Sequence, residues 1–218
     1  MKGLLIKDFK LMTTQKNFFV IILLIAIGMI SFTEDVSFPI GFLTFVLSLF
    51  TLSTISYDEF DNGYAFLFTL PITRVSYVLE KYCLGFLLGF GSWLLVTCLG
   101  IIASTVKNNT SLTEVWQIAA MILPIMIIIQ SLMIPFQLKF GGEKGRIAII
   151  GAVGFLLVAG ILILKGAKLF FNVDLIAQLN TLPIVSIGMI FLIALTIALL
   201  LLALSVRISI SIMKKKQF

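Results

Sequence analysis

The side chains best suited to recognition or chemistry in water lie between Tyr57 and Lys81, in the stretch YDEFDNGYAFLFTLPITRVSYVLEK. Its first half contains three acidic residues, Asp58, Glu59 and Asp61, and long apolar segments flank it on both sides. Acidic groups beside a membrane require a partner or exposure to water. We therefore interpret the stretch as a surface that docks on a separate protein. An ordinary interfacial loop without a partner is the alternative.

Catalytic chemistry has few possible residues in this chain. There is no His, which removes Ser-His and Cys-His catalysis and the common zinc sites. Cys83 and Cys98 are 15 residues apart, about 22 Å along a helix, so they cannot form a disulfide with each other. No GxxxxGK[ST] phosphate-binding loop occurs. The sequence predicts neither a catalytic site nor a metal site, and any ATP hydrolysis would take place on another chain.

The composition indicates a membrane protein. Of 218 residues, 60% are hydrophobic and only 12% are charged, too apolar for a water-soluble domain of this size. We predict a single all-α integral membrane domain. The net charge of +6 could favour nucleic acid. However, the basic residues lie at the boundaries of the apolar segments, where they act as orientation signals, so no nucleic-acid partner is predicted.

Six apolar segments have the length that a membrane-spanning helix needs, or nearly so. They cover residues 17–33, 38–57, 82–106, 115–140, 147–164 and 182–206. With the N-terminus inside the cell, thirteen of the sixteen Lys and Arg residues fall on the inner side. The bias of basic residues towards the cytoplasm therefore predicts that both termini are cytoplasmic.

Three connecting segments have patterns of their own. Residues 1–16 place apolar residues at helical spacing, with lysines elsewhere on the helix, as in a helix that lies in the membrane interface. A basic tail that only sets the topology is the alternative. Residues 165–181 alternate bulky apolar and polar side chains, and either a re-entrant segment or a solvated loop fits them. Residues 58–81 form the cytoplasmic loop.

Small polar and aromatic side chains inside the predicted spans are candidates for a substrate path. Thr44, Ser48 and Thr51 share one face of the second span, and Gln130 lies in the fourth. Phe42 and Phe45 could line a cavity for an amphipathic molecule. Close helix packing and ordinary core or lipid contacts are the alternatives. Buried ionisable groups that could bind a coupling ion are not evident in the spans, which disfavours an ion-driven carrier.

Turn and capping signals divide the cytoplasmic loop. Asn62-Gly63 is a turn signal, and Leu70-Pro71 ends the short apolar stretch that follows it. Thr73 can cap a new helix that begins at Arg74 and continues into the third span. This geometry would transmit a push on the loop to the neighbouring spans.

The spacing Glu59-x3-Gly63, followed by Leu70-Pro71-Ile72-Thr73-Arg74, Val78 and Lys81, resembles the cytoplasmic loop of type-2 ABC transporter permeases, the ABC-2 family. The opening MKGLLIKDFKL resembles the start of small bacterial members. The resemblance implies six spans, an N-terminal elbow helix, a coupling helix between spans two and three, and a re-entrant segment before span six. It also implies two groups of residues that contact an ATPase subunit. The coupling group comprises Asp58, Glu59, Asp61, Asn62, Gly63, Phe66, Leu70, Pro71, Ile72, Thr73, Arg74 and Lys81, and the second contact comprises Glu143, Lys144 and Arg146.

Among small permeases the chain is similar to exporters of phenol-soluble modulins, which are amphipathic peptide toxins. The resemblance implies an exporter in the bacterial cytoplasmic membrane that pairs with a second permease, either another copy of this chain or a similar permease. It also implies ATP and Mg²⁺ bound by the partner ATPase and no cofactor in this chain. A membrane scaffold or immunity protein that binds a partner within the bilayer is the alternative function. That alternative does not account for the capped loop with its Leu70-Pro71 corner.

Overall fold

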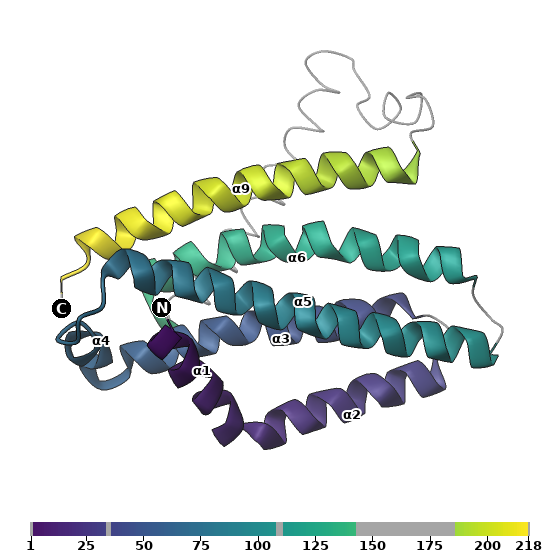
Figure 1. Cartoon of the computed structure of the whole chain (residues 1–218), viewed down its shortest axis with the longest axis horizontal. Coiled ribbons are helices and arrows are strands. Elements are labelled where there is room, and N and C mark those ends of the chain that lie inside the picture. The colour runs from purple at the N-terminus through teal and green to yellow at the C-terminus, as the bar shows by residue number, and fades with distance from the viewer. Residues whose placement is uncertain (1, 34–35, 108–110, 143–185, 218) are drawn as a thin grey trace, which may run out of the picture.

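The computed structural model describes residues 2–33, 36–107, 111–142 and 186–217. Over these residues all regular secondary structure is helical, and there is no strand. The long helices lie side by side along one common direction (Figure 1). In chain order the elements are α1 (Lys2–Thr14), α2 (Lys16–Phe32), α3 (Ser37–Glu59), the 3-10 turn η1 (Phe60–Asn62), α4 (Gly63–Leu67), α5 (Arg74–Lys107), α6 (Leu112–Phe140) and α9 (Ile187–Lys215).

Four of these helices, α3, α5, α6 and α9, are long and apolar enough to cross a bilayer. Helices α1 and α2 meet that test only as a pair, and they are bent by 70° at their junction. The protein is therefore a multi-pass membrane protein. The predicted span at 147–164, the predicted re-entrant segment at 165–181 and the start of the predicted span at 182–206 lie outside the described residues.

The boundaries of the described helices differ from the predicted ones mainly at one end of the bundle. Helix α3 continues to Glu59, two residues beyond the predicted span. Helix α5 begins at Arg74, where the helix that leads into the third span was predicted to begin. Only residues 60–73 connect the two helices. Helix α9 likewise continues beyond residue 206 to Lys215. The helices continue into polar residues because backbone hydrogen bonding does not depend on apolar side chains.

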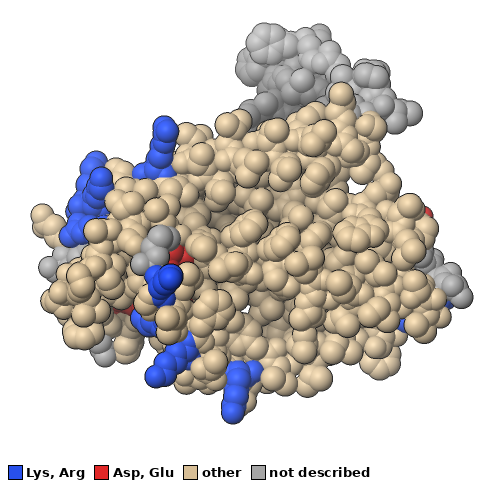
Figure 2. All heavy atoms as spheres, in the orientation of Figure 1, with Lys and Arg blue, Asp and Glu red and all other residues tan. Residues whose placement is uncertain are grey.

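One end of the bundle, called here the loop end, contains α1, α4 and both chain termini (Figure 1). The opposite end is called the far end. Lys and Arg side chains gather at the loop end on the face in view (Figure 2). At the far end Lys107 Nζ donates hydrogen bonds to the carbonyl oxygens of Ile30, Ser31 and Thr33, at 2.8, 2.8 and 3.0 Å. These bonds hold the end of α5 against the end of α2.

Helices α6 and α9 run in the same direction. Near their first turns, Ile118 and Ile187 line a common groove. Further along, the Ser205 hydroxyl donates to the carbonyl oxygen of Ser131. Near their last turns, Lys216 Nζ donates to the carbonyl oxygen of Leu138 at 3.2 Å. Both helices therefore end at the loop end.

Two glycines allow α5 to approach α3 and α6 closely. A Cβ atom at Gly85 would lie 2.7 Å from Gln130 Nε2 and 3.0 Å from Thr51 Oγ1. At Gly89 it would overlap Met126 Sδ and lie 3.1 Å from Ser48 Cβ. Next to these glycines, Gln130 Nε2 donates to Ser48 Oγ at 2.6 Å. The small residues of α5 thus create the space that holds a buried polar contact between α3 and α6.

A candidate docking site at the loop end

The turn after α3 depends on Asn62 and Gly63. Asn62 has a φ of 58°, in the left-handed region that asparagine tolerates better than most residues. A Cβ atom at Gly63 would lie 2.6 Å from the carbonyl oxygen of Asp58, so no larger residue fits there without movement of the backbone. The predicted turn at Asn62-Gly63 is confirmed. It reverses the chain and starts the short helix α4.

The predicted cap of α5 is also present. The backbone N–H of Ser76 donates to Thr73 Oγ1 at 3.1 Å, and α5 begins at Arg74. Leu70, Pro71 and Thr73 are exposed just before this cap. The corner between α4 and α5 is therefore fixed by a capped helix rather than by a long loop.

Three apolar side chains project from this corner region, and together they are called the apolar tip: Phe60, Phe66 and Leu70. The first two are each 73% exposed and Leu70 is 46% exposed. Phe66 and Leu70 were predicted site residues, whereas Phe60 was not. Phe60 directly follows the predicted contact residue Glu59 and precedes the Asn62-Gly63 turn, and that position was the available signal.

Aromatic rings support the apolar tip from beneath. Tyr64 and Phe68 both pack against Tyr77 of α5, with ring centroids 5.8 and 5.9 Å away. Burial raises the pKa of the Tyr64 phenol well above its ordinary value, so this side chain is neutral. The Lys216 ammonium lies 4.9 Å from the centre of the Tyr64 ring. Helix α4 is thereby packed onto both α5 and the end of α9.

Two of the predicted contact residues face inwards instead. Asp58 is 8% exposed and Lys81 is fully buried. They form an ion pair with an N–O distance of 2.8 Å, and the Tyr77 hydroxyl donates to the Asp58 carboxylate at 3.1 Å. The partners of Asp58 are thus within the chain. The sequence had suggested an acidic group that needed water or a docking protein.

Helix α1 completes this buried group. Asp8 is fully buried and pairs with Lys81, and its other oxygen lies 2.8 Å from Lys7 Nζ. Lys7 also pairs with Asp58. Burial raises the pKa of the Asp8 carboxyl, but the ammonium groups of Lys81 and Lys7 outweigh this effect and hold it below its ordinary value. The partly exposed Lys7 and the buried residues Asp8, Asp58, Glu80 and Lys81 are together called the buried ion cluster.

The buried ion cluster joins α1, α3 and α5. Glu80 is fully buried, with its carboxylate 3.5 Å from Lys81 Nζ. Sequence reasoning missed both Asp8 and Glu80. Asp8 is the sole acidic residue among the first 16 and stands four residues after Leu4, on one face of α1. That placement was the available signal. The cluster shows that ionisable groups are buried at the loop end, although none was expected inside the bundle.

Glu59, the last residue of α3, joins two other helix ends. Its carboxylate accepts hydrogen bonds from Lys216 Nζ at 2.9 Å and from the backbone N–H of Gly142 at 3.2 Å. Gly141 has a φ of 79°, and a Cβ atom there would lie 2.7 Å from Glu59 Oε2. Thus the predicted contact residue Glu59, which is partly exposed, links α3 to the ends of α6 and α9.

Arg74 reaches the same helix end from α5. Its Nη1 donates to the carbonyl oxygens of Met213 and Lys214 at 3.0 and 2.7 Å. These carbonyls belong to the last turn of α9, where they have no partner within the helix and a cation is favourable. Ile72 packs partly buried against the adjacent apolar cluster. Both residues, predicted as contacts, hold the corner in place.

The remaining predicted contacts cannot be placed in the site. Glu143, Lys144 and Arg146 lie outside the described residues, as does the side chain of Asp61. Among the described residues, no group of three or more His, Cys, Asp or Glu side chains is arranged to hold a metal ion.

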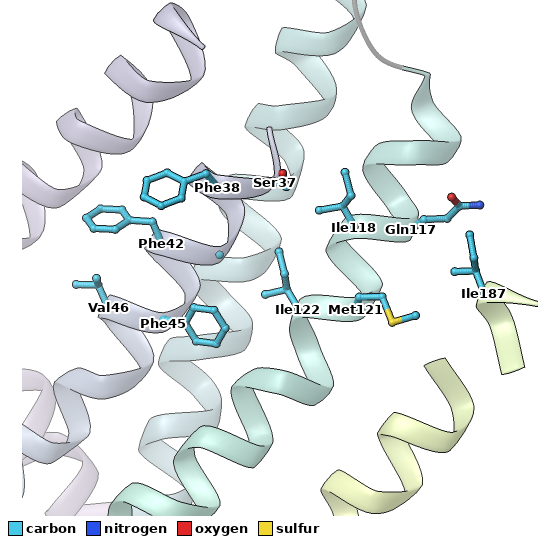
Figure 3. Close-up of a pocket in the computed structure, with 11 residues that line it drawn as sticks. Ser37, Phe38, Phe42, Phe45, Val46, Gln117, Ile118, Met121, Ile122 and Ile187 are labelled. Atoms are coloured by element: carbon cyan, nitrogen blue, oxygen red, sulfur yellow. The ribbon is translucent and has the colours of Figure 1, made fainter. Parts of the chain in front are cut away.

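The structure divides the predicted substrate path into two parts. Phe42 and Phe45 line a groove of about 900 Å³ near the far end, between α3, α6 and the start of α9. The side chains around it are almost all apolar, apart from Ser37 and Gln117 (Figure 3). The four polar residues Thr44, Ser48, Thr51 and Gln130 are buried and do not line the groove. Their positions agree with the helix-packing alternative.

The comparisons with known proteins agree with this architecture. The family model described as "ABC-2 family transporter protein" matches residues 3–214. No curated protein and no solved structure matches the chain. Because the family match covers nearly the whole chain, including α1, the apolar tip and α9, the protein belongs to the ABC-2 transporter family and is a membrane component of an ABC transporter.

Proposed function

We propose that the protein is the permease subunit of an ATP-driven exporter in the bacterial cytoplasmic membrane, with the loop end in the cytoplasm. Family membership supports the transport role. The gathering of Lys and Arg at the loop end supports the orientation, because basic residues favour the cytoplasmic side. In this proposal a separate subunit binds ATP and Mg²⁺. The permease changes shape in response.

The proposal includes six spans, with α1 as an elbow helix in the cytoplasmic interface. Helices α6 and α9 both end at the loop end, which agrees with the predicted span at 147–164 between them. The 70° bend between α1 and α2 supports an elbow. A second permease copy would complete the transport path. Most of the α9 surface is exposed and could contact protein or lipid.

The apolar tip is the observation that carries the docking proposal. Three large apolar side chains are exposed at the charged end of the protein, where water rather than lipid is expected. Exposed apolar groups on a fixed corner are typical of a protein contact. Asn62, Gly63, Pro71 and Thr73 would shape that corner, whereas Asp58 and Lys81 would support it from inside.

Movement of the docked corner would reach the spans through short links. Glu59, Arg74 and Lys216 connect the corner to the ends of α6 and α9. The buried ion cluster connects α3 and α5 to α1. Closure of the ATPase would therefore displace several helices together. We propose that an amphipathic molecule, with a peptide toxin or antimicrobial peptide as the first candidate, uses the groove lined by Phe42 and Phe45 and leaves the cell.

A Phe66→Asp/Leu70→Asp variant tests the docking. We expect at least about tenfold less ATPase to be retained, because loss of a central apolar contact costs roughly 2 kcal/mol or more. The tagged chain would be purified from membranes together with its ATPase, and nucleotide hydrolysis in the eluate would be measured per permease. Phe66→Leu/Leu70→Met is the matched control and should retain binding. Full hydrolysis and transport by the Asp variant would overturn the docking assignment.

A further inference from the structure

A second groove, distinct from the one near Phe42, opens between α6 and α9 at the loop end. Its volume is about 620 Å³. Most of its lining is apolar and comes from the last turns of the two helices, including Leu132, Phe136, Leu204 and Ile208. The side chains of Leu132, Leu204 and Ile208 are 46%, 55% and 53% exposed. The groove is therefore apolar and lies on the outside of the described helix bundle.

Two lysines lie at the end of this groove. Lys139 is in the last turn of α6 and Lys215 is the last residue of α9, and both line the groove. Both are exposed, and neither forms an ion pair with a carboxylate among the described residues. The neighbouring Lys216 is different, because it pairs with Glu59 at 2.9 Å. The chain thus satisfies one lysine internally and leaves two facing the groove.

Both lysines can interact favourably with the C-terminal dipole of their own helix. The helix dipole explains why each helix has a lysine in its last turn. It does not explain why both lysines lie at the same end of one apolar groove. The Lys139 ammonium lies 5.0 Å from the Phe140 ring, which keeps it beside the groove. Two cations at one end and apolar walls along the rest match an anionic headgroup followed by an acyl chain.

We propose that this groove binds one anionic phospholipid of the cytoplasmic leaflet, with its phosphate between Lys139 and Lys215 and an acyl chain along Leu204 and Ile208. This assignment of the leaflet rests on the proposed orientation of the loop end. A soluble phosphate compound would satisfy only the lysines, whereas the long apolar wall requires a chain. The lipid would fasten α6 to α9 where both adjoin Glu59, and so would stabilise the corner that carries the apolar tip.

The test uses the purified full-length chain in detergent, without any ATPase. Binding of phosphatidylglycerol and of phosphatidylcholine would be compared by native mass spectrometry and by the melting temperature at increasing lipid concentration. Each lysine near an anionic headgroup contributes roughly a fivefold preference, so two together give roughly twenty-fivefold. We expect Lys139→Gln/Lys215→Gln to remove most of the preference for phosphatidylglycerol. Lys2→Gln/Lys10→Gln, which removes two exposed lysines of α1 and the same net charge, should retain it.

A second variant tests the apolar wall without a change in charge. Ile208→Trp would fill part of the groove and is expected to weaken the binding of phosphatidylglycerol. Glycerol 3-phosphate, which has no acyl chain, should not change the melting temperature of this variant. If the two double lysine variants lose the preference for phosphatidylglycerol equally, the preference is a general effect of net charge. That result would overturn the site. Stabilisation by glycerol 3-phosphate to the same extent as by the lipid would also overturn it. If Ile208→Trp lowers the melting temperature equally in both lipids and the preference for phosphatidylglycerol persists, the groove is occupied by other residues of the chain. That result would also overturn the site.

Because no ATPase is present, this experiment separates the lipid site from the docking proposal. Suppose that the Lys139→Gln/Lys215→Gln variant loses the lipid preference, and that the wild-type chain purified from membranes in the docking experiment brings no ATPase with it. These two results together would support the lipid site and contradict the docking proposal. The opposite pair of results would contradict the lipid alone.

Discussion

Replacement of Lys81 by methionine is expected to lower the free energy of unfolding by roughly 3–5 kcal/mol, the usual cost of removing one partner from a buried ion pair. Lys81 is fully buried and is the shared cation of Asp8 and Asp58. Methionine keeps most of the volume, so the loss would come from two buried carboxylates that keep only the partly exposed Lys7 as an ammonium partner. Unfolding of the purified chain in mixed micelles, followed by circular dichroism, would measure the effect.

Two variants separate this effect from the loss of any lysine. Lys216→Met removes a partly exposed ion pair with Glu59 and should cost about 1 kcal/mol or less. A triple variant, Asp8→Asn/Asp58→Asn/Lys81→Met, removes both stranded charges with the cation and should recover a large part of the stability. If Lys81→Met were no more damaging than Lys216→Met, the buried ion cluster would not contribute in the way described.

A Gly89→Val substitution is expected to cost roughly 2–3 kcal/mol, because overpacking of a well-packed contact costs about 1–3 kcal/mol and Val adds more than one methyl group. A Cβ atom at this position would overlap Met126 Sδ and lie 3.1 Å from Ser48 Cβ. Met126 is itself fully buried and has little space into which to move. The variant should therefore separate α5 from α3 and α6 and lower the midpoint of unfolding.

Gly91 provides a matched control within two residues on the same helix. A Cβ atom at Gly91 would meet nothing within 4 Å. Gly91→Val carries the same change in helix propensity without the overlap, so any difference between the two variants reports the packing contact. Equal stability of the Gly89 and Gly91 variants would contradict the close approach of these helices.

Local signals in the sequence predicted the shape of the loop well. Asn62-Gly63 and Thr73 act on residues beside them in the chain, and both the turn and the cap are present. The face of α3 that carries Ser48 and Thr51 was likewise visible from helical spacing. The partner of that face could not be predicted, because residue spacing within one helix does not show which other helix packs against it. Gln130 of α6 and the glycines of α5 supply that answer.

The buried ion cluster could not be predicted for the same reason. Lys81 and Asp8 are 73 residues apart in the chain, and Lys7 and Asp58 are 51 apart. A lysine at the edge of an apolar segment is usually an orientation signal, so its burial becomes evident only once α1 is placed beside α5. Asp58 was assigned to a docking surface because the loop was considered without α1. The outward-facing residues Phe66 and Leu70 did not depend on such a distant contact.

Helix α5 is one uninterrupted rod of 34 residues, about 50 Å from end to end. Its first residue, Arg74, hydrogen-bonds to the last turn of α9 at the loop end, and its last residue, Lys107, hydrogen-bonds to the end of α2 at the far end. In the orientation proposed above, a rotation of α5 at the loop end would carry to the far end, so we propose that a spin label at Val106 would report nucleotide-driven rotation without contacting the ATPase.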